Sequence, residues 1–264
     1  MNLIKCILTG NDCYKSGRTI KPRGVMVHST GANNPTVKRY VQPSKTDPNF
    51  AALLAQIGTN ANGNDWNRAG VQKCVHAFIG KIADGSIASV QALPWNCRAW
   101  HAGNGSKGSA NDTHISFEIC EDGLTDKAYF AKVYREAVEL TAFLCKEYGL
   151  NPQADGVVIC HAEGHDRGTA SNHGDVLHWF PKHGKTMNDF RADVAAEMQT
   201  AEEAEEMVYY KTIKDVPKEY KPSVQKAIDA GALAGYGGGV LNLSEDLCRT
   251  LTILDRLGQL EKIK

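Results

Sequence analysis

The chain has no excess of either charge. Its 264 residues contain 30 Lys plus Arg and 30 Asp plus Glu. Proteins that bind nucleic acid or an anionic membrane surface through their overall field carry a surplus of basic residues. The balance therefore predicts no nucleic-acid partner and no general attraction to a charged membrane.

Long apolar runs are also missing. No stretch reaches the roughly 20 apolar residues of a membrane-spanning helix. The first residues, "MNLIKCILTGNDCYKSG", reach turn residues before they could form the apolar core of a signal peptide. We expect a protein that is made in the cytoplasm, without a membrane span or a classical export signal.

Cysteine is present but lacks the spacing of a disulfide framework or a metal-binding knuckle. The eight cysteines are scattered, none forms a C-x-x-C pair, and several lie in apolar runs such as "CVHAFIG" and "VVICH". Disulfide frameworks belong mainly to small secreted domains with regular cysteine spacing. The pattern indicates reduced thiols in a hydrophobic core.

Short apolar runs alternate with amphipathic segments over the first 200 residues. Runs rich in Val, Ile and Phe predict strands, and they cover residues 24–30, 73–80, 86–93, 113–120 and 156–161. Helices are expected at 49–58 and, most clearly, at 127–149, where Gly149 would cap the carboxyl end. The order predicts an α/β domain with a central mixed sheet flanked by helices.

The composition changes near residue 200. The segment "AAEMQTAEEAEEM" is acidic, rich in alanine and poor in large apolar residues, which is typical of a helix that runs into an exposed linker. We therefore expect a catalytic domain, a linker with the boundary near residue 205, and a small helical module, at residues 1–196, 197–208 and 209–264 respectively.

The predicted C-terminal module has two helices. One runs from about Lys221 to Gly231, and a glycine-rich turn follows at 235–239. The second begins after a Ser244 cap and would bury Leu247, Leu251 and Leu254.

Histidine is concentrated in one segment, since residues 157–184 contain five of the nine histidines. Imidazole is the commonest zinc ligand, and a catalytic zinc usually has three protein ligands and one open position. His28 closes the apolar run "GVMV" and His161 closes "VVIC", so neighbouring strands could present both rings at one sheet edge. A histidine after a strand is also an ordinary hydrogen-bonded residue, and spacing alone leaves both interpretations open.

Five blocks in order carry a resemblance to a known family. They are "GVMVHST", "VHAFIGKIADGSI", "AWHAGNGSKGSANDTHISFEICED", "VVICHAEGH" and "SNHGDVLHWF". Over residues 20–195 the chain resembles the zinc-dependent N-acetylmuramoyl-L-alanine amidases, whose fold is shared with T7-type lysozyme and peptidoglycan recognition proteins. The resemblance implies that fold and a Zn²⁺ cofactor.

The resemblance also implies a ligand set. His28 matches the family's first zinc ligand and His161 the second, and Asp175, four residues before Trp179, is the counterpart of the third. The chain departs from the family here, because "DVLHW" replaces the usual Pro-Gly and the spacing from His161 is longer. His173 and His165 therefore stay open as alternative third ligands.

Three further residues are candidates for the reaction. Glu118 matches the family's strand glutamate, and strand alternation would point it toward the site together with Ser116. His76 lies near the position of a polar group beside the zinc, and His173 near a residue that stabilises the oxyanion. His101 and Asn111 fit a substrate groove or a structural turn equally well.

The implied reaction is hydrolysis of the amide between N-acetylmuramic acid and the L-alanine of the peptide stem, so bacterial peptidoglycan is the expected partner. The C-terminal module resembles small wall-associating modules of clostridial and phage lytic enzymes, and distantly surface-layer-homology repeats, which implies a cell-wall polymer as its ligand. A dimerisation hairpin is the alternative for this module. The whole resembles an endolysin that acts on the wall after release, while a non-catalytic peptidoglycan-binding protein and a zinc peptidase that cuts within the stem remain alternatives.

Overall fold

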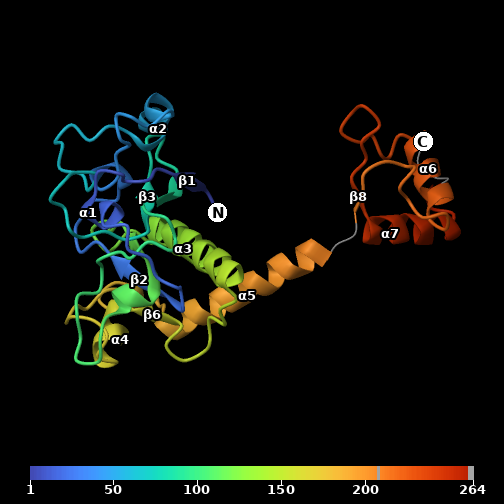
Figure 1. Ribbon diagram of the computed structural model, residues 1–264. Helices are drawn as coiled ribbons and strands as arrows, with labels where there is room; N and C mark the ends of the chain where they lie inside the picture. Colours follow the sequence, from blue (N-terminus) through green and yellow to red (C-terminus); the bar gives the residue numbers. More distant parts are fainter. Residues whose placement is uncertain (207–208, 261–264) are drawn as a thin grey trace. The chain divides into compact units, whose positions relative to one another are not determined.

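A six-stranded mixed sheet lies at the centre of the first of two units (Figure 1). The computed structural model describes residues 1–206 and 209–260, and the units are Met1–Gln199 and Thr200–Lys264. The strand order is β1-β4-β3-β5-β2-β6, with β3 and β4 antiparallel and the other pairs parallel. The strands are β1 (Leu3–Lys5), β2 (Gly24–Ser29), β3 (Ala77–Lys81), β4 (Ile87–Gln91), β5 (His114–Ile119) and β6 (Val158–Cys160). This confirms the predicted mixed α/β architecture.

The strand β2 is buried along its whole length between β5 and the edge strand β6. Its sequence, GVMVHS, is almost continuously apolar, as expected for a strand covered on both faces. Gly24 starts it, and a Cβ there would lie 2.3 Å from the carbonyl oxygen of Val157, so the approach to β6 requires glycine.

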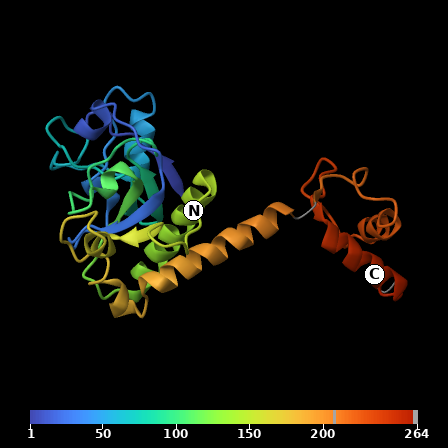
Figure 2. The same cartoon turned by 60° about the horizontal axis from the view of Figure 1, so that its bottom comes forward.

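Two long helices cover one face of the sheet. They are α3 (Lys127–Tyr148) and α5 (Met187–Glu206), which lie side by side (Figure 2). Tyr134 of α3 donates a hydrogen bond to Asp193 of α5 (2.7 Å). Gly149 ends α3 in the left-handed conformation (φ +62°), which confirms the predicted cap. Trp179, Phe180 and Cys160 are fully buried in this layer.

Shorter elements and loops cover the opposite face. These are α1 (Asp12–Lys15), α2 (Phe50–Ile57), α4 (His161–Asp166) and the 3-10 helices η1 (Val37–Arg39) and η2 (Ala110–Asp112). A third 3-10 helix, η3 (Phe180–His183), packs on the α3 side of the sheet. Gly164 of α4 packs against Met26 of β2, since a Cβ there would lie 2.7 Å from the methionine methyl carbon.

Two boundaries differ from the sequence predictions. β3 begins at Ala77 rather than at residue 73, because Cys74 pairs instead with Trp100 in an isolated bridge. The expected linker at 197–208 is helical as far as Glu206, since α5 continues through its alanine- and glutamate-rich sequence. The short edge strand β1 pairs with β4 and was not predicted, because three residues carry no readable alternation.

The second unit has a small core of its own. It contains α6 (Lys221–Asp229), α7 (Glu245–Arg256) and a two-stranded sheet of β7 (Tyr209–Tyr210) and β8 (Leu243–Ser244). Ser244 caps α7 by accepting a hydrogen bond from the backbone N–H of Leu247, as predicted. Leu251 and Leu254 pack in this core, but Leu247 is 38% exposed and Cys248 is buried in its place.

The eight cysteines are all buried and unpaired, as the sequence predicts. Burial raises the pKa of the Cys97 and Cys160 thiols to about 11, so neither forms a thiolate near neutral pH. Within the described residues, no helix combines the length and the apolar character needed to cross a membrane.

Candidate metal centre

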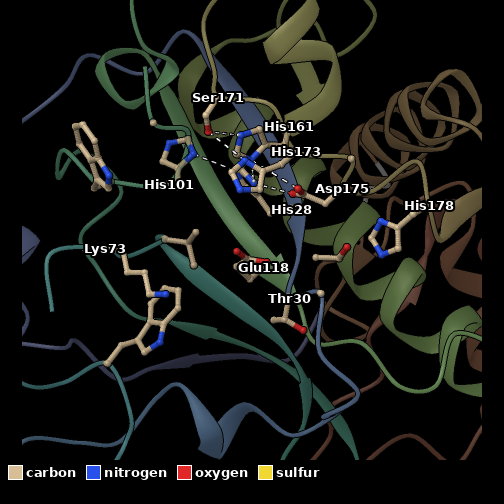
Figure 3. A pocket seen from close by; sticks show the side chains of 17 residues that line it. His28, Thr30, Lys73, His101, Glu118, His161, Ser171, His173, Asp175 and His178 are labelled. Carbon is tan, nitrogen blue, oxygen red and sulfur yellow. Dashed lines mark hydrogen bonds and ion pairs between the residues drawn. The ribbon is translucent and has the colours of Figure 1, made fainter. Parts of the chain in front are cut away.

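Three side chains converge at the carboxyl edge of the sheet (Figure 3). His28 lies near the end of β2, His161 directly follows the neighbouring parallel strand β6, and Asp175 comes from the loop after α4. The Nδ1 atom of His28 lies 3.1 Å from Nδ1 of His161 and 3.0 Å from Oδ2 of Asp175, and His161 Nδ1 lies 3.7 Å from Oδ1 of Asp175. Parallel pairing brings the two strand ends to one edge, so residues 133 positions apart share one site.

The donor set fits a zinc ion. Ligand atoms of all three residues lie within 4.8 Å of one another. Zn–N distances of about 2.1 Å at tetrahedral angles put two ligand atoms roughly 3.4 Å apart, close to the spacings seen here. His28 Nδ1 faces two partners, and a single ring N–H could serve only one of them, whereas an ion satisfies all three groups together. Two imidazoles and a carboxylate with room for a fourth ligand are typical of catalytic zinc.

Electrostatics at this cluster favour the metal-binding protonation state at His161 and Asp175, whereas a proton on His28 would have to leave when a metal binds. Burial, followed by the neighbouring His28, lowers the pKa of His161 to about 4, which keeps its ring neutral. Burial lowers the pKa of His28 too, but the hydrogen bond and charge of Asp175 outweigh it and raise the pKa overall. Burial likewise opposes ionisation of Asp175, yet His28 holds the pKa of that carboxyl below its usual range.

Outer hydrogen bonds orient both rings. His101 Nδ1 lies 2.9 Å from His28 Nε2, and the Oγ of Ser171 lies 3.3 Å from His161 Nε2. In each case the nitrogen remote from the cluster is engaged, which leaves Nδ1 for the cluster. His101 therefore belongs to the site, whereas Asn111 belongs to a turn, since its side-chain oxygen accepts from the backbone N–H groups of His101 and Ala102 (2.8 and 2.9 Å).

Glu118 lies beside the cluster on β5. Its register partner on β2 is His28, and both side chains line the same cavity. The Oε2 atom is buried and has no hydrogen-bond partner among the described residues. Burial raises the pKa of Glu118 to about 7. A carboxyl group that exchanges its proton near neutral pH is suited to general acid–base chemistry.

This raised pKa has a measurable effect on the metal-free protein. Glu118 keeps its proton up to about pH 7 in the folded state, whereas its reference pKa is 4.5. The preference of the folded state for this proton therefore contributes fully to the free energy of unfolding below pH 4.5, and the contribution is lost as the pH rises through 7. With metal removed by a chelator, the free energy of unfolding of Glu118→Gln should rise relative to that of wild type by at most about 3 kcal/mol between pH 5 and pH 9. Urea unfolding at both pH values measures the free energy of unfolding of each protein. If the difference in this free energy between the two proteins is the same at pH 5 and pH 9, the raised pKa of Glu118 is contradicted.

The cluster forms the base of a cavity of about 710 Å³. Lys73 and His178 lie on opposite sides of this base (Figure 3). The Lys73 ammonium lies 5.2 Å from the centre of the Trp66 ring, and Trp100, 39% exposed, also lines the cavity. The cavity thus joins the candidate metal-ligand cluster and a carboxyl group to a cationic, aromatic wall.

A family model described as N-acetylmuramoyl-L-alanine amidase (Amidase_2) matches residues 18–176, a range that holds the three clustered side chains and Glu118. The chain belongs to this amidase family. A comparison with curated proteins finds no match.

Several solved structures are similar to this chain. The hydrolase AmiA of Staphylococcus aureus, in complex with its ligand, is 15% identical over 77% of this chain and 86% of that chain, with a TM-score of 0.49. A mutant endolysin from Bacillus subtilis is 23% identical over 74% of this chain and 99% of its own, with a TM-score of 0.45. The endolysin N-acetylmuramoyl-L-alanine amidase LysCS of Clostridium intestinale is 16% identical over 74% and 95%, with a TM-score of 0.42.

The candidates for the third ligand lie at different places around the cavity. Asp175 belongs to the metal-ligand group found among the described residues, and neither His173 nor His165 does. The His173 ring centre lies 4.6 Å from that of His161, and its Nδ1 is 3.1 Å from the Oγ of Ser171 at the cavity wall. His165 Nδ1 lies 3.4 Å from the carbonyl oxygen of Ala170, outside the cavity lining.

His76 differs from the sequence prediction. It is fully buried, with Nδ1 beside Ser116 and Nε2 2.8 Å from the carbonyl oxygen of Cys97, and it does not line the cavity. Burial lowers its pKa to about 4. In the extended segment before β3, Lys73 and Val75 face the cavity and His76 faces away from it. Neighbouring residues of an extended segment point to opposite faces, so an error of one residue is enough to place His76 in the cavity.

Several other residues of the cavity could not be assigned from the sequence. Lys73 could have been found from the alternation in "KCVHA", whereas Trp66 and Trp100 lie outside the strands and carry no such signal. His178 also lines the cavity, while His183 stacks on Phe130 with ring centres 4.1 Å apart.

Proposed function

We propose that this protein is a zinc-dependent peptidoglycan amidase that hydrolyses the amide between the lactyl group of N-acetylmuramic acid and L-alanine. Family membership supports the amidase reaction. The observation that carries the zinc proposal is the convergence of His28, His161 and Asp175 on one point at the base of the cavity. These three residues would hold the ion.

A zinc ion held there would polarise the scissile carbonyl and lower the pKa of a water molecule. The rest of the chemistry belongs to the chain. Glu118, with an unpartnered oxygen at the cavity, would accept the proton of the attacking water and return it to the departing amine. His173 lines the same cavity and would donate a hydrogen bond to the developing oxyanion.

The experiment uses purified sacculi and the full chain. New free L-alanine amino groups should appear when the sacculi are digested. Elemental analysis should find one zinc per chain, and a chelator should stop the appearance of these amino groups. Amino groups on other stem residues would indicate a peptidase instead. Binding to sacculi without release, in a protein that holds no zinc, would overturn the proposal in favour of a non-catalytic binding protein.

We also propose that the protein acts on the wall after its release, as an endolysin does, and that its C-terminal unit binds an anionic cell-wall polymer. A groove of about 460 Å³ in this unit supports the second point. Among the described residues its three lysines have no carboxylate partner, whereas Lys226 and Arg249 elsewhere in the unit are paired with Asp255 and Glu245 (2.8 and 2.9 Å). The groove residues are Ile213, Lys214, Lys218, Lys221, Pro222 and Gln225.

Neutralising the groove should weaken wall binding. We expect the triple variant Lys214→Gln, Lys218→Gln, Lys221→Gln to bind walls about ten- to a hundredfold more weakly, since each exposed charge contributes on the order of 0.5–1 kcal/mol. Sedimentation with wall fragments at low and high salt measures this loss, and added salt should reduce wild-type binding in the same direction.

The matched control removes the same charge from exposed lysines of the first unit, Lys5, Lys15 and Lys132. Equal loss in both triple variants would show a general charge effect and contradict the groove. Unchanged binding of wild type to walls stripped of anionic polymer would contradict it as well.

A further inference from the structure

A buried carboxylate joins two of the segments that carry the metal-ligand residues. Glu121 follows β5 and is 3% exposed. Its Oε1 atom accepts a hydrogen bond from the backbone N–H of Gly31 (3.1 Å) and another from Nε2 of His178 (2.9 Å). Gly31 lies three residues after His28, and His178 lies three residues after Asp175.

The backbone of Glu121 strengthens the first of these links. Its N–H donates to the Oγ1 of Thr30 (3.1 Å), and its carbonyl oxygen accepts from the N–H of Asn34 (2.8 Å). The segment after β2 is therefore fixed to the end of β5 at three points. Because β2 and β5 are parallel neighbours, this holds the end of β2, and with it His28, in register.

The loop that carries Asp175 depends more heavily on the second link. Its residues from Asn172 to Gly174 are exposed, and Leu177 is 43% exposed. Buried Val176 and Trp179 anchor the loop on the core side. On the cavity side, the side chain of His178 links this loop to the segment after β5 by its hydrogen bond to Glu121. A buried carboxylate is costly to leave without partners, so the hydrogen bond from His178 favours the docked loop.

We infer that Glu121 is a positioning residue of the metal centre: one carboxylate oxygen binds Gly31 and His178 and thereby fixes the distance between the segments that carry His28 and Asp175. This inference rests on the proposed zinc site. Residues that hold metal ligands in place typically change metal affinity about 10- to 100-fold when they are removed. The role predicts an effect on zinc affinity in protein that remains folded.

The test measures the zinc dissociation constant of the full chain by competition with a chelating dye. We expect Glu121→Ala and His178→Ala to weaken binding, Glu121→Ala by about 10- to 100-fold and His178→Ala by less, because one of two hydrogen bonds survives. Glu121→Gln keeps an oxygen that can accept from both donors, so it should bind zinc nearly as tightly as wild type. The double variant should lose less than the two single losses combined, since both changes break the same link.

Glu136 provides the matched control. It is another buried carboxylate, 7% exposed, which accepts hydrogen bonds from the N–H of Asn2 and the hydroxyl of Ser89 (both 2.9 Å), away from the cavity. Glu136→Ala should lower thermal stability without changing zinc affinity. Circular dichroism of each chelated variant checks that it is folded, and exposed His178 gives a variant that should fold even if Glu121→Ala does not.

The inference is overturned if folded Glu121→Ala or, where that variant is unfolded, His178→Ala binds zinc as tightly as wild type. It is also overturned if Glu136→Ala loses as much affinity as Glu121→Ala. A wild type that binds no zinc is a different result, because it removes the proposed function itself.

Discussion

Glu118→Gln should retain zinc and lose nearly all amidase activity. Glutamine keeps the size of the side chain but cannot carry a proton between water and the departing amine. Removing a general acid–base group typically costs about 10²- to 10⁴-fold in rate, so we expect kcat on sacculi to fall within that range. Glu118 lies in register with His28 but outside the metal-ligand group, which is why metal content should stay at the wild-type level.

The measurement pairs turnover with zinc content. Glu136→Gln is the control, because it makes the same chemical change at a buried carboxylate on α3, and it should keep both activity and zinc. Wild-type turnover by Glu118→Gln would show that another group moves the proton. Loss of zinc from this variant would instead make Glu118 a ligand.

Asp175→Ala should lose zinc and activity together, whereas His173→Ala should keep zinc and turn over slowly. Asp175 contributes oxygen atoms 3.0 Å from His28 and 3.7 Å from His161, so its removal leaves two ligands, fewer than a catalytic zinc site normally has. His173 lines the cavity without joining that group. Loss of one oxyanion donor typically costs about 10²- to 10³-fold in kcat, and we expect that loss for His173→Ala.

Elemental analysis and sacculus hydrolysis of the two variants test this contrast. His165→Ala is the control, because it changes a histidine of the same segment that is outside the cavity lining, and it should keep zinc and activity. If His173→Ala loses the metal while Asp175→Ala keeps it, the roles of the two residues are reversed.

The sequence predicted the elements with the strongest periodicity. The apolar run of β2 and the amphipathic pattern of α3 have about the expected lengths in the structure, and the glycine cap at Gly149 is confirmed. The pairing of His28 with His161 also followed from sequence, because a side chain at the end of a parallel strand has a defined place at the sheet edge.

Residues outside regular strands could not be assigned in this way. His76 lies just before β3, where no continuous ladder fixes which side chains face the cavity, and the prediction chose the wrong face. Glu121 and His178 meet only through tertiary packing of two loops, so neither carries a local signal. The extent of α5 was missed because a solvated, apolar-poor sequence can continue a helix as readily as form a linker.

Oxidants find no accessible cysteine on the folded chain. All eight thiols are enclosed in hydrophobic cores, and the proposed zinc ligands are two imidazoles and a carboxylate, without sulfur. Peroxide and alkylating reagents attack exposed thiolates, which neither the cores nor the metal centre offer. An enzyme built this way can work in the oxidising surroundings of a lysed cell without protective disulfides. Once it unfolds, eight thiols are released at once, and their oxidation would make its inactivation permanent.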